Sequence, residues 1–441
     1  MRTANRIHSI LCISCALAMF ASAYAAEDPA LVEARQKFLR EMKSKFPEAR
    51  VQAVASFGKV ASVEVIEVLL KRGLQETEPS VRKAVRQVLR EKGSDPAIHK
   101  FLTAEFARNT KKPDREELLS GLLGGMVATE VPAEIDEAVK VLDEYLASPK
   151  GHLIVPMSLI DDLGMEGGKE AVRIIANLTK IKPFQNQFGY RRCVVQAMTR
   201  IQDPAAVGFL VEMLPGAYGL VQAEIIEHLT RVTKQKHKDN DREWTKWWTE
   251  NKATFTFPER VAAEEPVDPK QSTYYGIPIC AKRIVFVLDT SGSMRGYPME
   301  AAKMALLKTV ESLPESVSFD MVLFDKTAAV WQPRLLPATL QAKQMAAQTV
   351  IARGMSMGTA SHAALNAAFS LDPEVIYFLS DGEPTDGNPS QIIESMSERN
   401  RTRRISIHTI GVVTQKGGGA GLTFFMKPLA EHNYGSFRLV E

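Results

Sequence analysis

The hydrophobic positions in the last third of the chain form short, uninterrupted runs. Residues 284–288 (IVFVL) are apolar without alternation, and residues 374–380 (EVIYFLS) repeat this pattern. Such runs are typical of central strands in a parallel sheet, which are covered on both faces. Further strands are predicted at 317–324, 404–410 and 436–440, and helices at 297–313, 338–352, 360–369 and 421–431. This alternation predicts a mainly parallel α/β sheet with helices on both faces.

Helical periodicity dominates the region before these runs. Amphipathic helix patterns lie at 49–58, 80–89, 191–207 and 222–229. Val51 and Val81, in the first two patterns, stand 30 residues apart, and a second predicted helix follows each pattern. This spacing resembles that of HEAT-like α-solenoid repeats, which usually bind proteins along an extended surface, although residues 105–185 match it loosely. An irregular helical bundle without a partner is the alternative.

Three of the four tryptophans stand close together at the end of the helical region. They lie in the segment DREWTKWW at 241–248, and their spacing places them on one face of a helix. Such a face usually packs, so a cap on the last repeat is favoured over an aromatic platform for a ligand. A polar segment that contains prolines follows and is typical of a linker.

These patterns predict a multidomain chain. Its parts are an all-α, solenoid-like region at 26–252, a linker at 253–279 and a doubly wound, Rossmann-like α/β domain at 280–441. A length of 441 residues fits this division, because it is too great for one ordinary core. A hydrophobic content of 45% and a charged content of 24% exclude a disordered or collagen-like chain.

The first 25 residues have the three parts of a secretory signal peptide. Arg2 and Arg6 provide the basic start, residues 10–21 the apolar core, and residues 23–25 (AYA) the small-residue cleavage pattern. We therefore predict a mature protein that begins at Ala26 and is exported, either to the periplasm or outside the cell. An uncleaved membrane anchor is the alternative, but the apolar run is short for a span. No transmembrane segment is predicted after signal cleavage.

Charge and cysteine content exclude two further classes of site. The formal net charge is +3, and removal of Arg2 and Arg6 with the leader leaves +1. A chain this close to neutral has no general electrostatic attraction for DNA or RNA, so we predict no nucleic-acid partner. Only Cys193 and Cys280 remain after the leader, and they lack the spacing of a zinc site. A disulfide between them and two free thiols are both open.

Polar side chains follow both apolar runs at the point where each predicted strand ends. Asp289, Ser291 and Ser293 follow the first run as D-x-S-x-S, and Asp381 follows the second. Because parallel strands bring their carboxyl ends to one edge of a sheet, we expect the two acids to lie side by side. Thr359 follows a glycine-rich loop and starts a predicted helix, where its hydroxyl is available. Oxygen donors without His or Cys beside them suit Mg²⁺, Mn²⁺ or Ca²⁺, and suit zinc or copper poorly.

Together these residues resemble a von Willebrand factor type A domain with its metal-ion-dependent adhesion site, over roughly residues 280–441. That site consists of D-x-S-x-S, a distant Thr and an Asp after a later strand. All five positions are present here, as Asp289, Ser291, Ser293, Thr359 and Asp381. The resemblance implies that the hydroxyls ligate a divalent metal directly and that the acids act mostly through water. It also implies that an acidic residue of a protein ligand completes the coordination.

The expected function is that of an exported, non-enzymatic binding protein. Its metal site engages a protein ligand, and its helical repeats provide further protein contacts. The alternative is a structural or assembly factor in which the repeats carry recognition and the metal only stabilises the α/β domain.

A serine hydrolase is a remote alternative, because GMSMG at 354–358 matches G-x-S-x-G. A nucleophile elbow requires a strand directly before it, whereas residues 341–352 are predicted to be helical. His408 lies in a predicted strand, and His362 and His432 have no predicted partner that would support them as bases. Metal-dependent binding is therefore favoured over catalysis.

Overall fold

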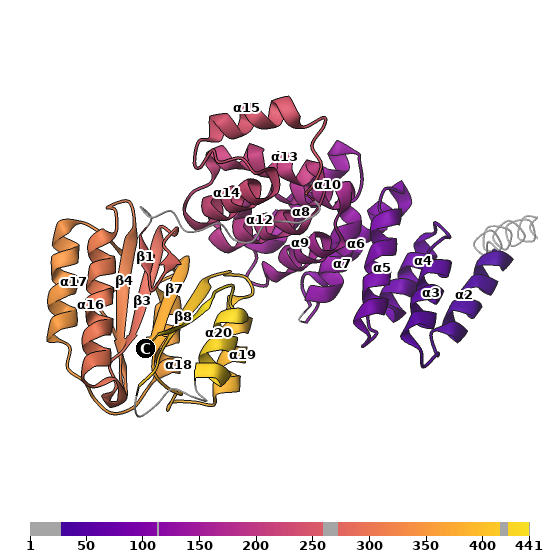
Figure 1. Cartoon of the computed structure of the whole chain (residues 1–441). Helices are drawn as coiled ribbons and strands as arrows, with labels where there is room; N and C mark the ends of the chain where they lie inside the picture. The colour runs from indigo at the N-terminus through magenta and orange to yellow at the C-terminus, as the bar shows by residue number, and fades with distance from the viewer. Residues whose placement is uncertain (1–27, 113, 259–271, 415–421, 441) are drawn as a thin grey trace, which may run out of the picture. The chain divides into compact units, whose positions relative to one another are not determined.

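The structure, a computed structural model, describes residues 28–112, 114–258, 272–414 and 422–440 (Figure 1). The chain forms two compact units, residues 1–138 and 139–441. The predicted signal peptide at 1–25 and the centre of the predicted linker lie outside the described residues. The predicted domain boundaries therefore stay predictions. Among the described residues, no helix is both long enough and apolar enough to span a membrane.

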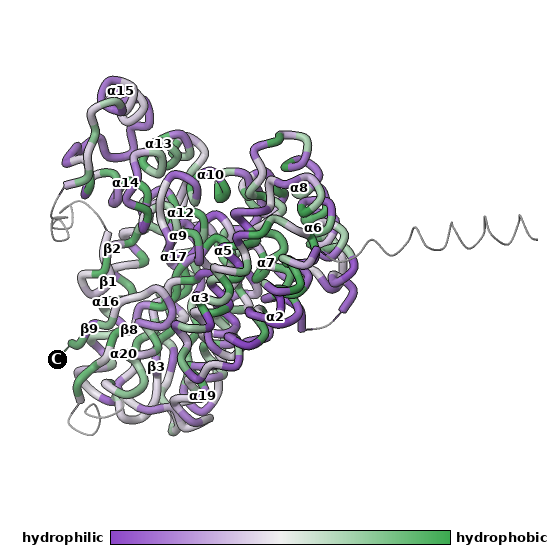
Figure 2. Tube along the Cα trace, turned by 90° about the vertical axis from the view of Figure 1, so that its right-hand side faces the viewer, coloured by the Kyte–Doolittle hydropathy of each residue, from purple (hydrophilic) through white to green (hydrophobic). Residues whose placement is uncertain are grey.

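The first unit consists of packed helices. They are α2 (Pro29–Glu41), α3 (Pro47–Phe57), α4 (Val63–Arg72), α5 (Pro79–Lys92), α6 (Pro96–Asn109), α7 (Glu116–Met126) and the first part of α8 (Pro132–Ala147). Asp28 and Asp95 begin α2 and α6 in the same way, with a carboxylate that accepts backbone N–H groups and a proline at the first helical position. Helix α3 packs against α2 and α5, and α5 packs against α7. Helix α7 is buried along most of its length and is largely hydrophobic in Figure 2.

The second unit begins with further helices, so the predicted all-α region is confirmed. They are α9 (Ile154–Glu166), α10 (Gly168–Leu178), α11 (Lys182–Asn186), α12 (Phe188–Arg200), α13 (Pro204–Met213), α14 (Gly219–Thr233) and α15 (Asp241–Asn251). The tryptophan face of α15 packs against α13. Trp244 is completely buried, and a Cβ at Gly208 of α13 would lie only 2.9 Å from Nε1 of Trp248.

A mainly parallel sheet follows, as predicted. Its strands run in the order β5-β4-β3-β7-β8-β9, with β6 also paired to β4. The strands β3 (Arg283–Asp289), β4 (Ser318–Phe324), β7 (Val375–Ser380), β8 (Ser406–Val412) and β9 (Phe437–Val440) are parallel, whereas β5 (Ala328–Val330) and β6 (Leu336–Pro337) are antiparallel to β4. The α/β fold class is thus confirmed.

Alternate residues of β3 pack into the two halves of the core. Ile284 and Phe286 pack with residues of α16 (Tyr297–Ser312) and α17 (Leu340–Ala352). Val285 packs on the other face with residues of α18 (Ser361–Ser370), α19 (Pro389–Asn400) and α20 (Lys427–Glu431). Figure 1 shows these two layers of helices on either side of the sheet. An uninterrupted apolar run was therefore the correct signal for a strand covered on both faces.

The structure differs from the predicted elements at several points. Strand β8 begins at Ser406 rather than at residue 404, because Arg404 has a φ of 54° that no strand accommodates. The predicted helix at 421–431 is a π-helical turn, Leu422–Met426, followed by the short α20. Helix α19 and strands β5 and β6 were not predicted. A hairpin of β1 (Thr273–Tyr274) and β2 (Ile277–Pro278) occupies part of the predicted linker and packs into the α/β core.

Helices α9, α12 and α14 contact the sheet where β7 and β8 begin. Arg192 of α12 donates to Oγ of Ser406 at 2.8 Å and to the Glu224 carboxylate of α14 at 2.6 Å. Arg404, which is only 4% exposed, donates to the Asp161 carboxylate of α9. These contacts lie at the opposite edge of the sheet from the ends of β3 and β7, where the metal ligands are predicted.

Candidate metal centre

Asp289 is the last residue of β3 and lies beside the end of β7. Leu288 pairs with Leu379 across the two parallel strands, so Asp289 reaches the level of Ser380. The Ser380 hydroxyl donates to Oδ2 of Asp289 at 2.6 Å, and the Ser291 backbone N–H donates to Oδ1 at 2.8 Å. Both carboxylate oxygens are therefore held in place by the strand end and by the loop that follows it.

A chain of hydrogen bonds connects this loop to Asp381. The hydroxyl oxygens of Ser291 and Ser293 are 2.9 Å apart, and the Ser293 hydroxyl donates to Oδ1 of Asp381 at 2.8 Å. The Thr414 hydroxyl donates to the other oxygen of Asp381 at 3.0 Å. Four of the five predicted ligand residues thus form one contiguous cluster at the carboxyl edge of the sheet.

Thr359, the fifth predicted ligand, is buried on a neighbouring loop just before α18. Its backbone N–H donates to the Thr385 hydroxyl at 2.8 Å, and its carbonyl oxygen accepts from the Thr385 N–H at 2.9 Å. Asp386 then accepts from the N–H groups of His362 and Ala363, in the first turn of α18. Within the described part of the chain, the hydrogen bonds join Thr359 to the loop after Asp381 and not directly to the other four side chains.

Residues 353–358 form a second loop, which contacts residues 290–294. Residues 290–294 carry the predicted ligands Ser291 and Ser293 and are called the metal loop below. The Ser356 N–H donates to the Thr290 carbonyl oxygen at 3.3 Å, and Ser356 forms a parallel bridge with Ser291. Arg353 donates to Oδ2 of Asp325 at 2.9 Å and to the Thr290 hydroxyl at 3.2 Å. The cluster is therefore braced from this side by backbone contacts and by one ion pair.

Sequence reasoning did not single out Ser380, Thr385, Asp386, Asp325 or Arg353. Ser380, Thr385 and Asp386 could have been predicted from a local motif, because the segment SDGEPTD at 380–386 contains many oxygen-bearing side chains. The ion pair between Asp325 and Arg353 had no local signal, since the two residues come from separate elements.

Two buried acids lie in the cluster, and neither has a basic partner in the part of the chain that the structure describes. Asp289 and Asp381 are 0% and 1% exposed, and no ion pair with a described Lys, Arg or His reaches either one. Burial raises the pKa of Asp289 to about 6, although the hydrogen bonds from Ser380 and Ser291 favour its ionised form. A cation at this edge would supply the missing positive charge. The donor set therefore fits a hard divalent ion.

The kind of ion follows from the kinds of donor. Among the described residues, no three or more His, Cys, Asp or Glu side chains gather in a group that could hold a metal. The cluster offers only two carboxylates, and its other donors are hydroxyls. Such a set suits Mg²⁺ or Mn²⁺ better than zinc, which prefers His and Cys.

The G-x-S-x-G segment lacks the setting of a hydrolase nucleophile. Helix α17 precedes it, as predicted, so Ser356 does not stand on a turn between a strand and a helix. His408 lies within β8, where burial lowers its pKa to about 4 and its ring stacks on Tyr377. His362 opens α18 beside the Asp386 cap.

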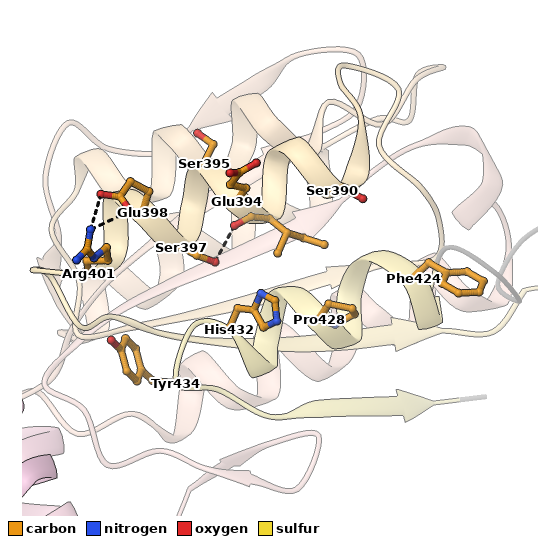
Figure 3. A pocket seen from close by; sticks show the side chains of 11 residues that line it. Ser390, Glu394, Ser395, Ser397, Glu398, Arg401, Phe424, Pro428, His432 and Tyr434 are labelled. Atoms are coloured by element: carbon orange, nitrogen blue, oxygen red, sulfur yellow. Dashed lines mark hydrogen bonds and ion pairs between the residues drawn. The ribbon is translucent and has the colours of Figure 1, made fainter. Parts of the chain in front are cut away.

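A separate cavity of about 890 Å³ lies between α19 and the segment around α20 (Figure 3). Its lining is mixed, with serines, an exposed Phe424 and the ion pair between Glu398 and Arg401. Glu394 and His432 face it from the two sides, as Figure 3 shows. None of the five predicted metal ligands lines this cavity.

Comparison with known proteins identifies the α/β part. Residues 282–423 match the family model of the von Willebrand factor type A domain, so the expected type A domain is confirmed. The inter-alpha-trypsin inhibitor heavy chain H1 of Mesocricetus auratus is 36% identical over 148 residues, which cover 30% of this chain and 16% of that protein. Heavy chain H4 of Homo sapiens is 30% identical over 138 residues, which cover 28% and 15%. The chain thus spans less than a fifth of the length of these relatives.

Solved structures give more distant matches. A von Willebrand factor type A protein from Catenulispora acidiphila is 20% identical, with a TM-score of 0.33, over 37% of this chain and 40% of that one. The conserved hypothetical protein BatB from Bacteroides thetaiotaomicron is 18% identical, with a TM-score of 0.29, over 36% of this chain and 89% of that one.

Proposed function

We propose that this protein is an exported, non-enzymatic binding protein that engages a protein ligand through a divalent metal. The hydroxyls of Ser291, Ser293 and Thr359 would hold Mg²⁺ or Mn²⁺, with Asp289 and Asp381 close by. The observation that carries the proposal is the hydrogen-bonded cluster of four predicted ligands, with two buried acids that have no basic partner among the described residues. Type A domains commonly mediate binding between proteins, which supports the same function.

The donor set also explains why the ligand should be acidic. Three of the proposed direct ligands are neutral hydroxyls, and the two acids are proposed to act mostly through water, so no anionic oxygen of this chain is proposed to bind the cation directly. An anionic oxygen is then the most favourable further ligand for a hard cation. We therefore expect an Asp or Glu side chain of the partner to complete the coordination. The cation would supply electrostatic attraction and no chemical step.

Export and the role of the helical repeats belong to the same proposal. The leader supports export, and the packed helices before the type A domain offer further surface for protein contacts. In the alternative function, these helices alone carry recognition and the metal only stabilises the sheet edge. Capture of partners from the exporting cell, in Mg²⁺ and in chelator, separates the two, since only the metal-bridge function loses its partner in chelator.

Calorimetry on the full chain tests the metal site directly. We expect Ser293→Ala to weaken Mg²⁺ or Mn²⁺ binding by about tenfold or more, because the substitution removes one ligand and one hydrogen bond to Asp381. Ser356→Ala is the matched control, since that serine contacts the metal loop through its backbone. Equal metal affinity in wild type and Ser293→Ala would exclude the proposed site.

A further inference from the structure

Two exposed methionines stand beside the candidate metal centre. Met355 and Met357 belong to the loop GMSMG at 354–358, and their exposed fractions are 37% and 84%. Single exposed apolar side chains are ordinary on protein surfaces. Two on one short loop, on either side of the residue that pairs with the metal loop, require an explanation.

Other residues hold this loop in its conformation. Gly358 has a φ of +92°, and a Cβ there would lie 3.1 Å from Cα of Lys326. The Ser356 N–H donates to Thr290, and the ion pair between Arg353 and Asp325 fastens the start of the loop. The methionine side chains take no part in these contacts. Their exposure is therefore not a by-product of folding the loop.

The loop lies next to two of the proposed ligands. Ser356 forms its bridge with Ser291, and its carbonyl oxygen would be 3.8 Å from a Cβ at Gly292, which stands between Ser291 and Ser293. Met355 and Met357 flank Ser356 directly in the chain. A partner that places an acidic side chain at the metal would therefore bring its neighbouring residues onto these methionines.

We propose that Met355 and Met357 form the apolar half of the binding surface, and that the partner segment carries one acidic side chain flanked by large apolar side chains. This inference rests on the proposed function and defines its ligand more closely. The cation selects the acid, while the methionines bury the neighbouring apolar side chain and exclude water around the contact. Because methionine is flexible and polarisable, the surface accepts Leu, Ile, Met or Phe at the flanking positions.

The net charge of the chain argues for this partner. The formal net charge of the full chain is only +3, so the charge of the whole chain adds little attraction for an acidic ligand to that of the proposed cation. A highly acidic partner gains little from additional charges beyond the metal. Apolar contact is then the main remaining source of affinity for residues next to the acid.

A display library tests the inference. The full chain, in Mg²⁺, selects peptides with a fixed central Asp and random residues on both sides. We expect large apolar residues to be enriched next to the Asp. A synthetic peptide with Leu on both sides of the Asp should then bind about tenfold more tightly than one with Ser on both sides. The double substitution Met355→Ser and Met357→Ser should abolish this difference and leave the metal affinity unchanged.

The control substitutions are made at exposed methionines on the outer helices. Met304 of α16 and Met345 of α17 are 68% and 38% exposed, similar to the pair in the loop. Met304→Ser with Met345→Ser should leave peptide preference and metal affinity unchanged. Loss of the preference in this control would show that general surface hydrophobicity had caused it, and would overturn the inference.

The outcomes separate the inference from the function on which it rests. Absence of metal binding in the wild type refutes the proposed function. Intact metal binding with no enrichment, or with polar residues next to the Asp, refutes only the apolar surface. Self-association of the wild type that Met355→Ser and Met357→Ser prevent would instead make a second copy of this chain the occupant, and would overturn the assignment of a separate partner.

Discussion

At the residue scale, two buried acids of the sheet, Asp289 and Asp320, differ in the number of carboxylate oxygens that accept hydrogen bonds. Both oxygens of Asp289 accept hydrogen bonds. Asp320, in β4, is 0% exposed, and only its Oδ1 accepts hydrogen bonds, from the N–H groups of Met321 and Gln332. Its Oδ2 has no hydrogen-bond partner among the described residues. Burial raises the pKa of Asp320 to about 7.

This environment makes stability depend on pH with a defined sign. The pKa of Asp320 in the folded chain, about 7, exceeds its ordinary value of 3.8, so the folded state binds the proton more tightly. The stabilisation is complete below pH 3.8 and is lost as the pH rises toward 7. Asp320→Asn removes the buried charge, so it should stabilise the chain by about 1–3 kcal/mol at pH 8 and by little at pH 4.

Urea unfolding of wild type and Asp320→Asn at both pH values checks this prediction. The comparison at each pH cancels the titration of all other groups, which the two proteins share. A stability difference that is the same at pH 4 and pH 8 would contradict the raised pKa of Asp320.

At the element scale, helix α18 depends on a cap from a distant loop. Asp386, which follows β7, accepts from the N–H groups of His362 and Ala363 at 3.1 and 2.9 Å. The same loop holds the backbone of Thr359 through Thr385. The cap therefore sets the position of the fifth proposed ligand as well as the start of the helix.

Asp386→Ala should cost about 1 kcal/mol of stability and weaken Mg²⁺ affinity, because the loop that carries Thr359 loses its anchor. Asp386→Asn should retain most of the stability and most of the Mg²⁺ affinity, since the amide oxygen of the asparagine still accepts hydrogen bonds from the N–H groups of the helix. Urea unfolding and calorimetry on the two variants measure these effects. Full metal affinity in Asp386→Ala would show that Thr359 does not depend on this cap.

At the scale of the whole molecule, buried polar contacts join α9 and α12 to the sheet. Arg404 is buried between the start of β8 and Asp161, and its guanidinium lies 3.4 Å from Sγ of Cys193. Cys193 is a free thiol, and burial raises its pKa to about 12. Cys193 is therefore buried in this contact, where its thiolate form is disfavoured and alkylating reagents cannot reach its sulfur.

Arg404→Met should destabilise the second unit by about 2 kcal/mol, because it removes the hydrogen bonds that the buried guanidinium donates to Asp161 and Gln196, although Asp161 keeps its ion pair with Arg200. It should also increase the rate of alkylation of Cys193. Arg401→Met is the control, since Arg401 pairs with Glu398 on the surface, where an ion pair contributes under about 1 kcal/mol. Urea unfolding measures the change in stability, and mass spectrometry after timed alkylation measures the rate at which Cys193 reacts. Equal alkylation rates in the two variants would show that Arg404 does not keep this contact closed.

Processing is also a property of the whole molecule. The leader predicts cleavage after residue 25, so the exported protein should begin at Ala26. Mass spectrometry of the intact exported chain measures its first residue. Retention of residues 1–25 would favour the membrane-anchor alternative.

Local patterns were sufficient wherever neighbouring residues carry the physical cause. The apolar runs of β3 and β7 report burial on both faces, and the acids that follow them share one edge because parallel strands end together. Helix α19 was missed although Asn388 and Pro389 form a start signal of the kind seen at Asp203 and Pro204. The local sequence therefore contained enough information to predict the start of α19.

Other features emerged only with the fold, because they join residues far apart in the chain. The hydrogen bond from Ser380 to Asp289, the Asp386 cap on α18 and the burial of Arg404 against Asp161 each need two or more elements to be packed first. No periodicity or spacing encodes such pairs. The proposed ligand residues, their order along the chain and the shared edge of the two acids thus follow from local pattern, whereas the hydrogen bonds that join the loops, the lack of a counter-charge among the described residues and the place of Met355 and Met357 beside the cluster follow from tertiary packing.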